Sequence, residues 1–240
     1  MSHAVRFGSL VLPNDDMPTL IRKAKNLEDC GFDIFAGADH FCDWSDVSRP
    51  WFEGWISLTA VALATAKLRI VDRLLSNDTS SFDGEYYSIK DAVMRPAPIQ
   101  SPRPPIIIGA LGPVMCRFAA RAADTWNTMS FADSFDKQLA EAREKIAIVD
   151  EACAKAGRDP ATLRRSYLMY DPTARRSGGA FAYYESVGAF EDYAGRIMEA
   201  GFSELVLYYP AVAEQEPMME RIAQDVFPKL RAAHPSTGAA

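Results

Sequence analysis

An Asp-His pair offers the clearest acid–base chemistry in this sequence. Asp39 and His40 directly follow a short apolar segment, residues 32–38, that is typical of a buried strand. An imidazole titrates near neutral pH and can both accept and donate a proton, so His40 is the central candidate. The other two histidines, His3 and His234, lie near the chain ends. The alternative for His40 is a loop residue that caps a backbone group.

A turn with two glycines is the second candidate. It joins an expected strand, residues 105–110, to an expected helix, residues 113–123. Glycine lets a backbone approach a ligand, and a helix N-terminus offers unpaired N–H groups and a positive dipole end to a phosphate. Such turns are common in α/β proteins, so the signal is weak alone. Arg117, in the first turn of the helix, either adds charge or points to solvent. The candidate phosphate-binding residues are Gly109, Ala110, Leu111, Gly112, Pro113, Val114 and Met115.

Three residues at strand ends are further candidates for the site. Asn127 ends an expected strand and would contact a cofactor or orient a loop, whereas the preceding Trp126 favours packing. Tyr208 and Tyr209 end the last strand and alternate in direction, so at most one of them faces the mouth of a barrel.

Two loops could shape a substrate pocket. Trp44, Trp51 and Phe52 follow the second strand and would either wall an apolar pocket or pack within their loop. Residues 173–186 contain Arg-Arg-Ser-Gly-Gly and later Phe-Ala-Tyr-Tyr, which suits a mobile lid. The alternative for this second loop is a disordered connection.

The overall composition restricts the classes of function. The formal net charge of −6 argues against a phosphate-neutralising surface, so we expect no nucleic-acid partner. No apolar run reaches the ~18–20 residues of a membrane helix, and residues 1–7 lack the apolar core of a secretion signal. The four cysteines form no CxxC pair, which favours reduced thiols in a cytoplasmic protein. Because no ligand-rich cluster is present, we expect no metal site.

The apolar pattern predicts strands that alternate with helices, and these elements would position the candidate residues. Such alternation indicates a parallel sheet, because each crossover between parallel strands needs a helix. The third strand is only a stub. The expected strands are residues 5–12, 32–38, 68–70, 105–110, 125–129, 165–170 and 204–209. The first expected helix begins at residue 17, after Asp16 as its N-cap, and stops at Gly31. The other expected helices are residues 55–66, 113–123, 135–156, 190–200 and 218–231, the last one bent at Pro228.

The region between residues 71 and 104 contains no strand–helix unit. It holds a hairpin-like segment at residues 82–89 and most of a proline-rich arm, residues 96–105, that favours an extended chain. A closed barrel needs eight strands and ~250 residues. We therefore expect one incomplete domain over residues 1–233, missing a βα region near residues 70–75, and a flexible tail over residues 234–240.

Eight segments, in the same order, resemble the coenzyme F420 (deazaflavin)-dependent branch of the luciferase-like monooxygenase superfamily. They are RFG at 6–8, GFDIFAGADHF at 31–41, the helix from Trp55 that leads into ATAKLRI, FDGEYYSI at 82–89, PAPIQSPRPPIIIGALGP at 96–113, AARAADTWNT at 119–128, AGRDPATLRRS at 156–166 and AGFSELVLYYP at 200–210. The resemblance implies an α/β fold, a TIM-barrel-like (β/α)8 barrel truncated here to six or seven strands, with its site at the carboxyl ends of the strands.

The resemblance also implies a function. In family members the Asp-His pair lies near the deazaflavin ring and the substrate, and the glycine turn holds the cofactor phosphate. Asp39 and His40 would then act at the ring, the turn at residues 109–115 would bind the phosphate, and Asn127 would contact the cofactor. The implied reaction is hydride transfer between F420 and a small organic substrate.

The chain departs from the family after LRI at residues 68–70, which runs almost directly into VDRLL. The rest of the third strand, its helix, the fourth strand and most of the next helix are absent. This departure leaves two alternatives open: a non-catalytic or degenerate flavin- or deazaflavin-binding protein, and an FMN-dependent monooxygenase. An open barrel also exposes two sheet edges, so we expect a homodimer or a larger assembly.

Overall fold

The computed structural model describes residues 3–37, 69–70, 80–83, 88–92 and 105–235, with side chains over 3–37 and 105–235. Several features expected from the sequence lie outside the described residues. They are Asp39, His40, Trp44, Trp51, Phe52, the helix over residues 55–66, most of the proline-rich arm, and residues 236–240 of the tail.

Seven strands form one sheet in which every neighbouring pair is parallel. Their order is β3-β2-β1-β9-β8-β7-β6, so the first strand of the chain pairs with the last, as in a (β/α)8 barrel. This order confirms the truncated barrel, including its stub-like third strand. The strands are β1 (Arg6–Val11), β2 (Ile34–Gly37), β3 (Arg69–Ile70), β6 (Ile107–Gly109), β7 (Thr125–Thr128), β8 (Arg164–Leu168) and β9 (Glu204–Tyr208).

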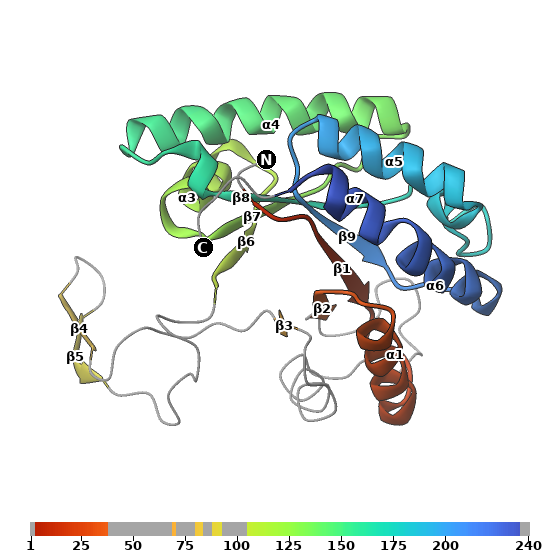
Figure 1. Cartoon of the computed structure of the whole chain (residues 1–240). Coiled ribbons are helices and arrows are strands. Elements are labelled where there is room, and N and C mark those ends of the chain that lie inside the picture. The colour runs from red at the N-terminus through yellow and green to blue at the C-terminus, as the bar shows by residue number, and fades with distance from the viewer. Residues whose placement is uncertain (1–2, 38–68, 71–79, 84–87, 93–104, 236–240) are drawn as a thin grey trace.

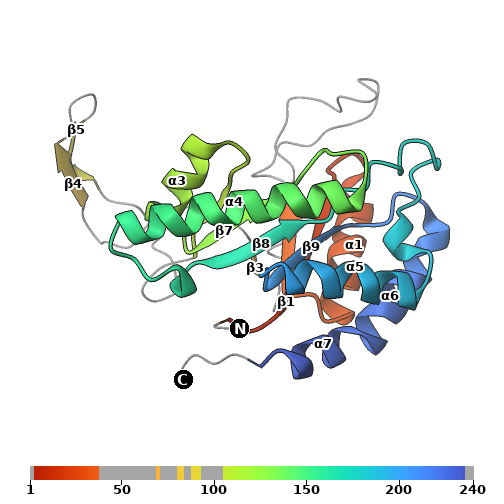
Figure 2. The same cartoon turned by 90° about the horizontal axis from the view of Figure 1, so that it is seen from above.

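Helices lie around the outer, convex side of the curled sheet (Figure 1), and Figure 2 shows the same arrangement from above. The α-helices are α1 (Met17–Asp29), α3 (Pro113–Ala122), α4 (Phe135–Lys155), α5 (Val187–Glu199), α6 (Glu216–Asp225) and α7 (Phe227–Ala233). Three short 3-10 helices are η1 (Pro160–Thr162), η2 (Ala182–Tyr184) and η3 (Ala213–Gln215). The concave side of the sheet therefore corresponds to the interior of a barrel, and a barrel enzyme holds its site where the carboxyl ends of the strands open from that interior.

The ends of α1 follow from local sequence. The Asp16 carboxylate accepts the N–H of Thr19 at 2.8 Å and so caps the first turn. Pro18 lies in that turn, where its missing N–H removes no helical hydrogen bond. Gly31 has a φ of +81°, a conformation that side chains with a Cβ rarely adopt, and the helix ends just before it. The predicted start and stop of this helix are both confirmed.

The main core lies between the sheet and the helices. Phe227 of α7 stacks on Phe7 of β1 with ring centroids 3.6 Å apart, and Phe190 of α5 packs on Phe227 at 6.0 Å. Nearer the other edge of the sheet, Trp126 of β7 is fully buried, which confirms its predicted packing role. All four rings belong to one hydrophobic cluster, so the open sheet still has a continuous core under its helices.

The sheet is open between β3 and β6, since neither strand has a second partner among the described residues. A hairpin of β4 (Ser80–Asp83) and β5 (Ser88–Ala92) confirms the hairpin-like segment expected from the sequence. It forms a separate antiparallel sheet and pairs with neither edge strand over these residues. The edges of the larger sheet thus retain backbone groups with no strand partner in the described part of the chain.

The C-terminal helix differs from the prediction of one helix over residues 218–231 bent at Pro228. Two helices are present instead: α6 ends at Asp225, and α7 begins at Phe227. The break comes before the proline because Pro228 has no N–H to donate to the carbonyl four residues earlier, while its fixed backbone fits the first turn of a helix. Pro228 accordingly begins a helix here rather than bending one.

Candidate cofactor site

The two tyrosines at the end of β9 point in opposite directions, as strand alternation predicts. Tyr209 lies on the helix side, where its hydroxyl accepts a hydrogen bond from Asn26 at 3.3 Å and the Lys23 ammonium lies 4.9 Å from its ring centroid. Tyr208 projects to the concave side and stacks on Phe181 with centroids 5.5 Å apart. Burial raises the pKa of Tyr208 to about 12, so its hydroxyl stays protonated near neutral pH. Of the two tyrosines, only Tyr208 can therefore face the mouth of the incomplete barrel.

The glycine turn between β6 and α3 is fixed at Ala110. The Ala110 N–H donates to the carbonyl of Asn127 at 2.9 Å. Its own carbonyl accepts the indole N–H of Trp126 at 3.1 Å and the thiol of Cys116 at 3.7 Å. Ala110 is buried, whereas Gly109 and residues 111–115 are exposed. The turn thus has one anchored residue and an open outer surface.

This open surface carries backbone donors without partners. The N–H groups of Leu111, Gly112, Val114 and Met115 donate to no acceptor among the described residues. A Cβ built on Gly109 or Gly112 would meet no atom of the described residues within 4 Å, so these residues leave space beside both glycines. Free N–H groups at the positive end of a helix are the features that phosphate groups bind in many proteins. The geometry therefore fits the phosphate role predicted for the turn.

Asn127 lies directly beside the turn. Its pairing register places it between Gly109 of β6 and Ser166 of β8. Its Nδ2 donates to the Ser166 hydroxyl oxygen at 2.8 Å, and its backbone carbonyl holds Ala110 as described above. Both alternatives raised by the sequence, contact with a cofactor and orientation of a loop, fit this half-buried position.

The loop after β8 is ordered around a buried carboxylate. Asp171 accepts the N–H of Thr173 at 2.8 Å and, across the loop, the N–H of Ala182 at 2.6 Å. The hydroxyl of the fully buried Tyr184 donates to a carbonyl of β9 at 2.9 Å. Of the two alternatives for residues 173–186, the disordered connection is wrong, because these bonds fix the loop at both ends. The lid role stays a prediction.

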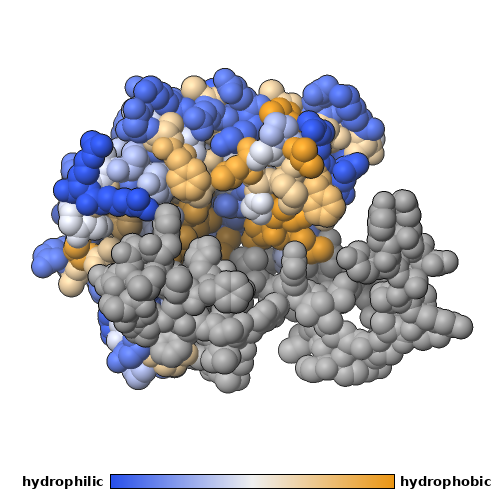
Figure 3. Space-filling model, turned by 180° about the vertical axis from the view of Figure 1, so that it is seen from behind, coloured by the Kyte–Doolittle hydropathy of each residue, from blue (hydrophilic) through white to orange (hydrophobic). Residues whose placement is uncertain are grey.

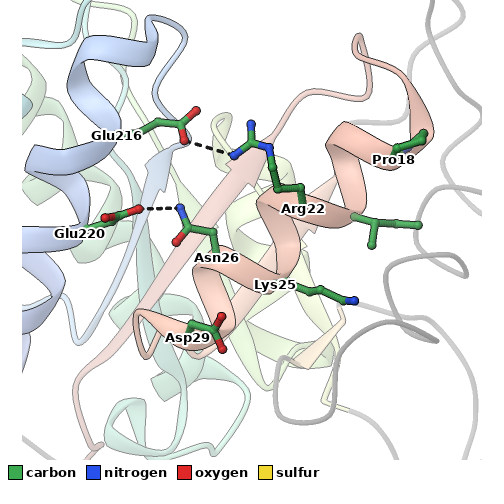
Figure 4. Close-up of a pocket in the computed structure, with 8 residues that line it drawn as sticks. Pro18, Arg22, Lys25, Asn26, Asp29, Glu216 and Glu220 are labelled. Atoms are coloured by element: carbon green, nitrogen blue, oxygen red, sulfur yellow. Dashed lines mark hydrogen bonds and ion pairs between the residues drawn. The ribbon is translucent and has the colours of Figure 1, made fainter.

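Two surface pockets of the described residues lie away from the glycine turn and Asn127. The larger, of about 530 Å³, lies between α1 and α6 on the outer helical layer (Figure 4). Arg22 and Asn26 point across it to Glu216 and Glu220, at 3.3 and 3.0 Å, so these polar groups are already paired. The other, of about 410 Å³, borders residues that include His3. Because barrel enzymes act at the carboxyl ends of their strands, the glycine turn is the better candidate.

The described cysteines are free thiols. Cys30, Cys116 and Cys153 form no disulfide. Burial raises the pKa of all three thiols, for Cys30 to about 11, so they stay protonated near neutral pH. Among the described residues, no three His, Cys, Asp or Glu side chains gather as metal ligands. None of the helices in that part of the chain is long and apolar enough to cross a membrane.

Two polar residues near the site were not found by sequence reasoning. Ser166 is fully buried next to Asn127, and Glu204 is only 1% exposed at the start of β9. The one available signal was a glutamate at the beginning of the otherwise apolar segment ELVLYY. Their relation to Asn127 depends on the pairing of three strands that lie far apart in the sequence.

Comparison with known sequences points to one family. Residues 67–173 match the luciferase-like monooxygenase family. The F420-dependent glucose-6-phosphate dehydrogenase of Microbacterium testaceum is 34% identical over 110 residues, which are 44% of this chain and 30% of that protein. The enzyme of the same name from Amycolatopsis mediterranei is 28% identical over 206 residues, with 69% of this chain and 60% of that protein covered. The chain thus spans less than two thirds of the length of either relative.

The second of these alignments also supports the internal deletion. The alignment extends over 206 positions but covers only 69% of the 240 residues of this chain, which is fewer than 206 residues. Part of the relative is therefore aligned with a gap in this chain. The structure of coenzyme F420-dependent tetrahydromethanopterin reductase from Methanopyrus kandleri has a similar fold, with a TM-score of 0.73 at 15% identity over 95% of this chain and 99% of that chain. The strand order, the matched region and this likeness of fold agree: residues 67–173 match the luciferase-like monooxygenase family, and the fold is that of a barrel of this kind with part of its strands missing.

Proposed function

We propose that this protein binds coenzyme F420 and catalyses hydride transfer between it and a small organic substrate. The observation that carries the proposal is the open turn between β6 and α3, with its free backbone donors at a helix N-terminus. The named relatives, which are F420-dependent dehydrogenases, support the choice of cofactor. When bound, the deazaflavin would supply the hydride chemistry, and the protein would position it and handle a proton.

Each part of the chain would then have a distinct role. The exposed N–H groups of the turn would hold the cofactor phosphate, and Asn127 would contact the cofactor beside it. Asp39 and His40, which lie outside the described residues, would act at the ring, with His40 accepting or returning the proton. Tyr208 stays protonated on the concave side and would offer a neutral hydroxyl.

Titration with the two cofactors tests the proposal. We expect F420 to bind with a lower Kd than FMN, measured by the change in cofactor absorbance or fluorescence. Tighter binding of FMN would favour an FMN-dependent monooxygenase. Failure to bind either cofactor at high micromolar concentration would remove the oxidoreductase proposal.

A pair of variants in the same titration tests the turn itself. Val114 lies in the first turn of α3 with 71% of its surface exposed. Val114→Glu would place a carboxylate where the phosphate binds, and we expect the Kd of F420 to rise about tenfold through like-charge repulsion. The same carboxylate interacts favourably with the helix N-terminus, so the stability of the fold should be retained. Val114→Gln is the uncharged control, and equal Kd values for both variants would contradict phosphate binding here.

A non-catalytic flavin- or deazaflavin-binding protein is the second candidate function. The missing part of the barrel favours it, because the absent strand ends would contribute part of the pocket around the ring. Turnover above background by the purified protein supports the enzyme. Tight cofactor binding without turnover of any tested substrate supports the binding protein.

We also infer that the protein is a homodimer or larger and that it is cytoplasmic, where its free thiols stay reduced. Figure 3 shows apolar side chains reaching the surface of the described part. Four large apolar side chains in the turn before α3 and in its first half are 42–71% exposed and spaced as one stripe: Leu111, Val114, Met115 and Phe118. Phe118 is the one that lies beyond the proposed phosphate-binding residues, so the interface would cover this end of the stripe. Such an exposed patch commonly marks a protein interface.

Light scattering on the purified protein tests the assembly. We expect a mass of at least two chains at micromolar concentration, and a shift toward the monomer in Phe118→Lys because the substitution places a charge in the apolar stripe. Phe131→Lys is the control, since Phe131 is also exposed to solvent, at 61% against 46% for Phe118, but lies in the loop before α4. A wild-type protein that remains a clean, stable monomer contradicts the inference.

A further inference from the structure

A row of polar residues crosses the concave face of the sheet. Register pairs Glu204 of β9 with Ser166 of β8, Ser166 with Asn127 of β7, and Asn127 with Gly109 of β6. Paired residues of neighbouring parallel strands project to the same face. Glu204 is the first residue of its strand, whereas Gly109 is the last of its own. The row therefore runs from the amino-terminal edge of the sheet to the glycine turn between β6 and α3, which is the proposed cofactor turn.

Glu204 is an unusual member of this row because it is a carboxylate in the interior. It is 1% exposed, and among the described residues neither of its oxygens meets the distance and angle limits of a hydrogen bond. Burial raises its pKa, while Ser166, Arg164 and Arg6 favour the charged form and Asp33 disfavours it. The Arg164 Nε lies 3.9 Å from the carboxylate, an ion-pair distance rather than a hydrogen bond.

Ser166 connects this carboxylate to the cofactor turn. Its oxygen accepts the Nδ2 proton of Asn127 at 2.8 Å. A serine hydroxyl can accept and donate at the same time, so its hydrogen remains available for a second partner. Glu204 is its neighbour in the register, and a charged carboxylate is a stronger acceptor than a neutral carboxyl group. With Nδ2 held by Ser166, the other end of the Asn127 amide has a defined direction.

We propose that Glu204 is a positioning residue: its carboxylate accepts the Ser166 hydroxyl, and Ser166 in turn fixes the Asn127 amide beside the cofactor turn. The effect on cofactor binding rests on the proposed function, whereas the coupling of the three side chains does not. The competing explanation is that Glu204 only pairs with Arg164 to stabilise the sheet. That explanation predicts a change in stability without a change at Asn127.

Nuclear magnetic resonance of the Asn127 side-chain amide measures the coupling in the protein without cofactor. Its signals are identified by their loss in Asn127→Asp. We expect them to shift in both Ser166→Ala and Glu204→Gln, which keeps the size of the side chain but removes its charge. They should stay in place in the control Thr128→Val, since Thr128 adjoins Asn127 on β7 but its buried hydroxyl has no hydrogen-bond partner in the described part of the chain. If the Asn127 amide signals do not shift in Glu204→Gln, the proposal is overturned.

The Kd of F420 measures the consequence for binding. Loss of the oriented amide should raise it about tenfold in Ser166→Ala and Glu204→Gln, the effect of one hydrogen bond, and leave it unchanged in Thr128→Val. In the wild type, lowering the pH protonates Glu204 and should raise the Kd of F420. The part of this rise that comes from Glu204 should be absent in Glu204→Gln. An unchanged Kd in Glu204→Gln overturns the positioning role. If the wild type binds no cofactor while the amide coupling persists, the coupling stands and only the proposed function fails.

Discussion

Replacing His40 by alanine is expected to lower turnover by ~10²–10⁴-fold while cofactor affinity stays nearly constant. His40 follows the second strand, at the carboxyl end where barrel enzymes place their chemistry, and the family resemblance puts this Asp-His pair near the deazaflavin ring. A side chain that accepts or returns a proton contributes mainly in the transition state. Its loss should therefore appear in kcat and kcat/KM together, with little change in the Kd of F420.

The matched control is His234→Ala, since His234 is the capping residue at the end of α7, outside the proposed site. Steady-state kinetics with any substrate that the wild type turns over gives the comparison, and the cofactor titration gives the affinity. An unchanged rate in His40→Ala would make His40 a structural residue. A large rise in Kd would instead place it in cofactor binding.

Local signals in the sequence predicted much of the fold. The Asp16 cap and the Gly31 stop of α1 act through their own backbone neighbours, and so can be recognised without a structure. The stub at residues 69–70 was recognisable because no strand–helix unit follows it in the sequence. The end of α6 was misplaced because Pro228 suits both a bend and a helix start, and only packing decides between them.

The site was less predictable because its geometry depends on pairing between distant strands. The glycine turn could be identified from a strand, two glycines and a helix, all adjacent in the sequence. The connection of Glu204 to Asn127 arises from the register of β7, β8 and β9, which no local pattern encodes. Residues 173–186 look like a polar loop, yet one buried carboxylate, Asp171, orders them through bonds across the loop.

The Phe227→Ala variant is expected to lose about 3–5 kcal/mol of unfolding free energy, the usual range for removing a buried phenylalanine. Phe227 is fully buried at the start of α7. Its ring stacks on Phe7 at 3.6 Å and meets the edge of Phe32 at 5.0 Å. These contacts attach the last helix to the first strand and the loop that precedes the second. The loss is large beside the ~5–15 kcal/mol that stabilises a typical domain.

Urea denaturation measures this loss, with the slope of the transition compared between variants to confirm that the same surface unfolds. Phe131→Ala is the control because Phe131 is 61% exposed and has an edge contact with Tyr170, so its removal should cost less than about 1 kcal/mol. Because β1 already pairs with β9, the packing of α7 on β1 adds to the strand hydrogen bonds that join the two ends of the chain. Equal losses in the two variants would show that the contact between α7 and β1 contributes little to stability.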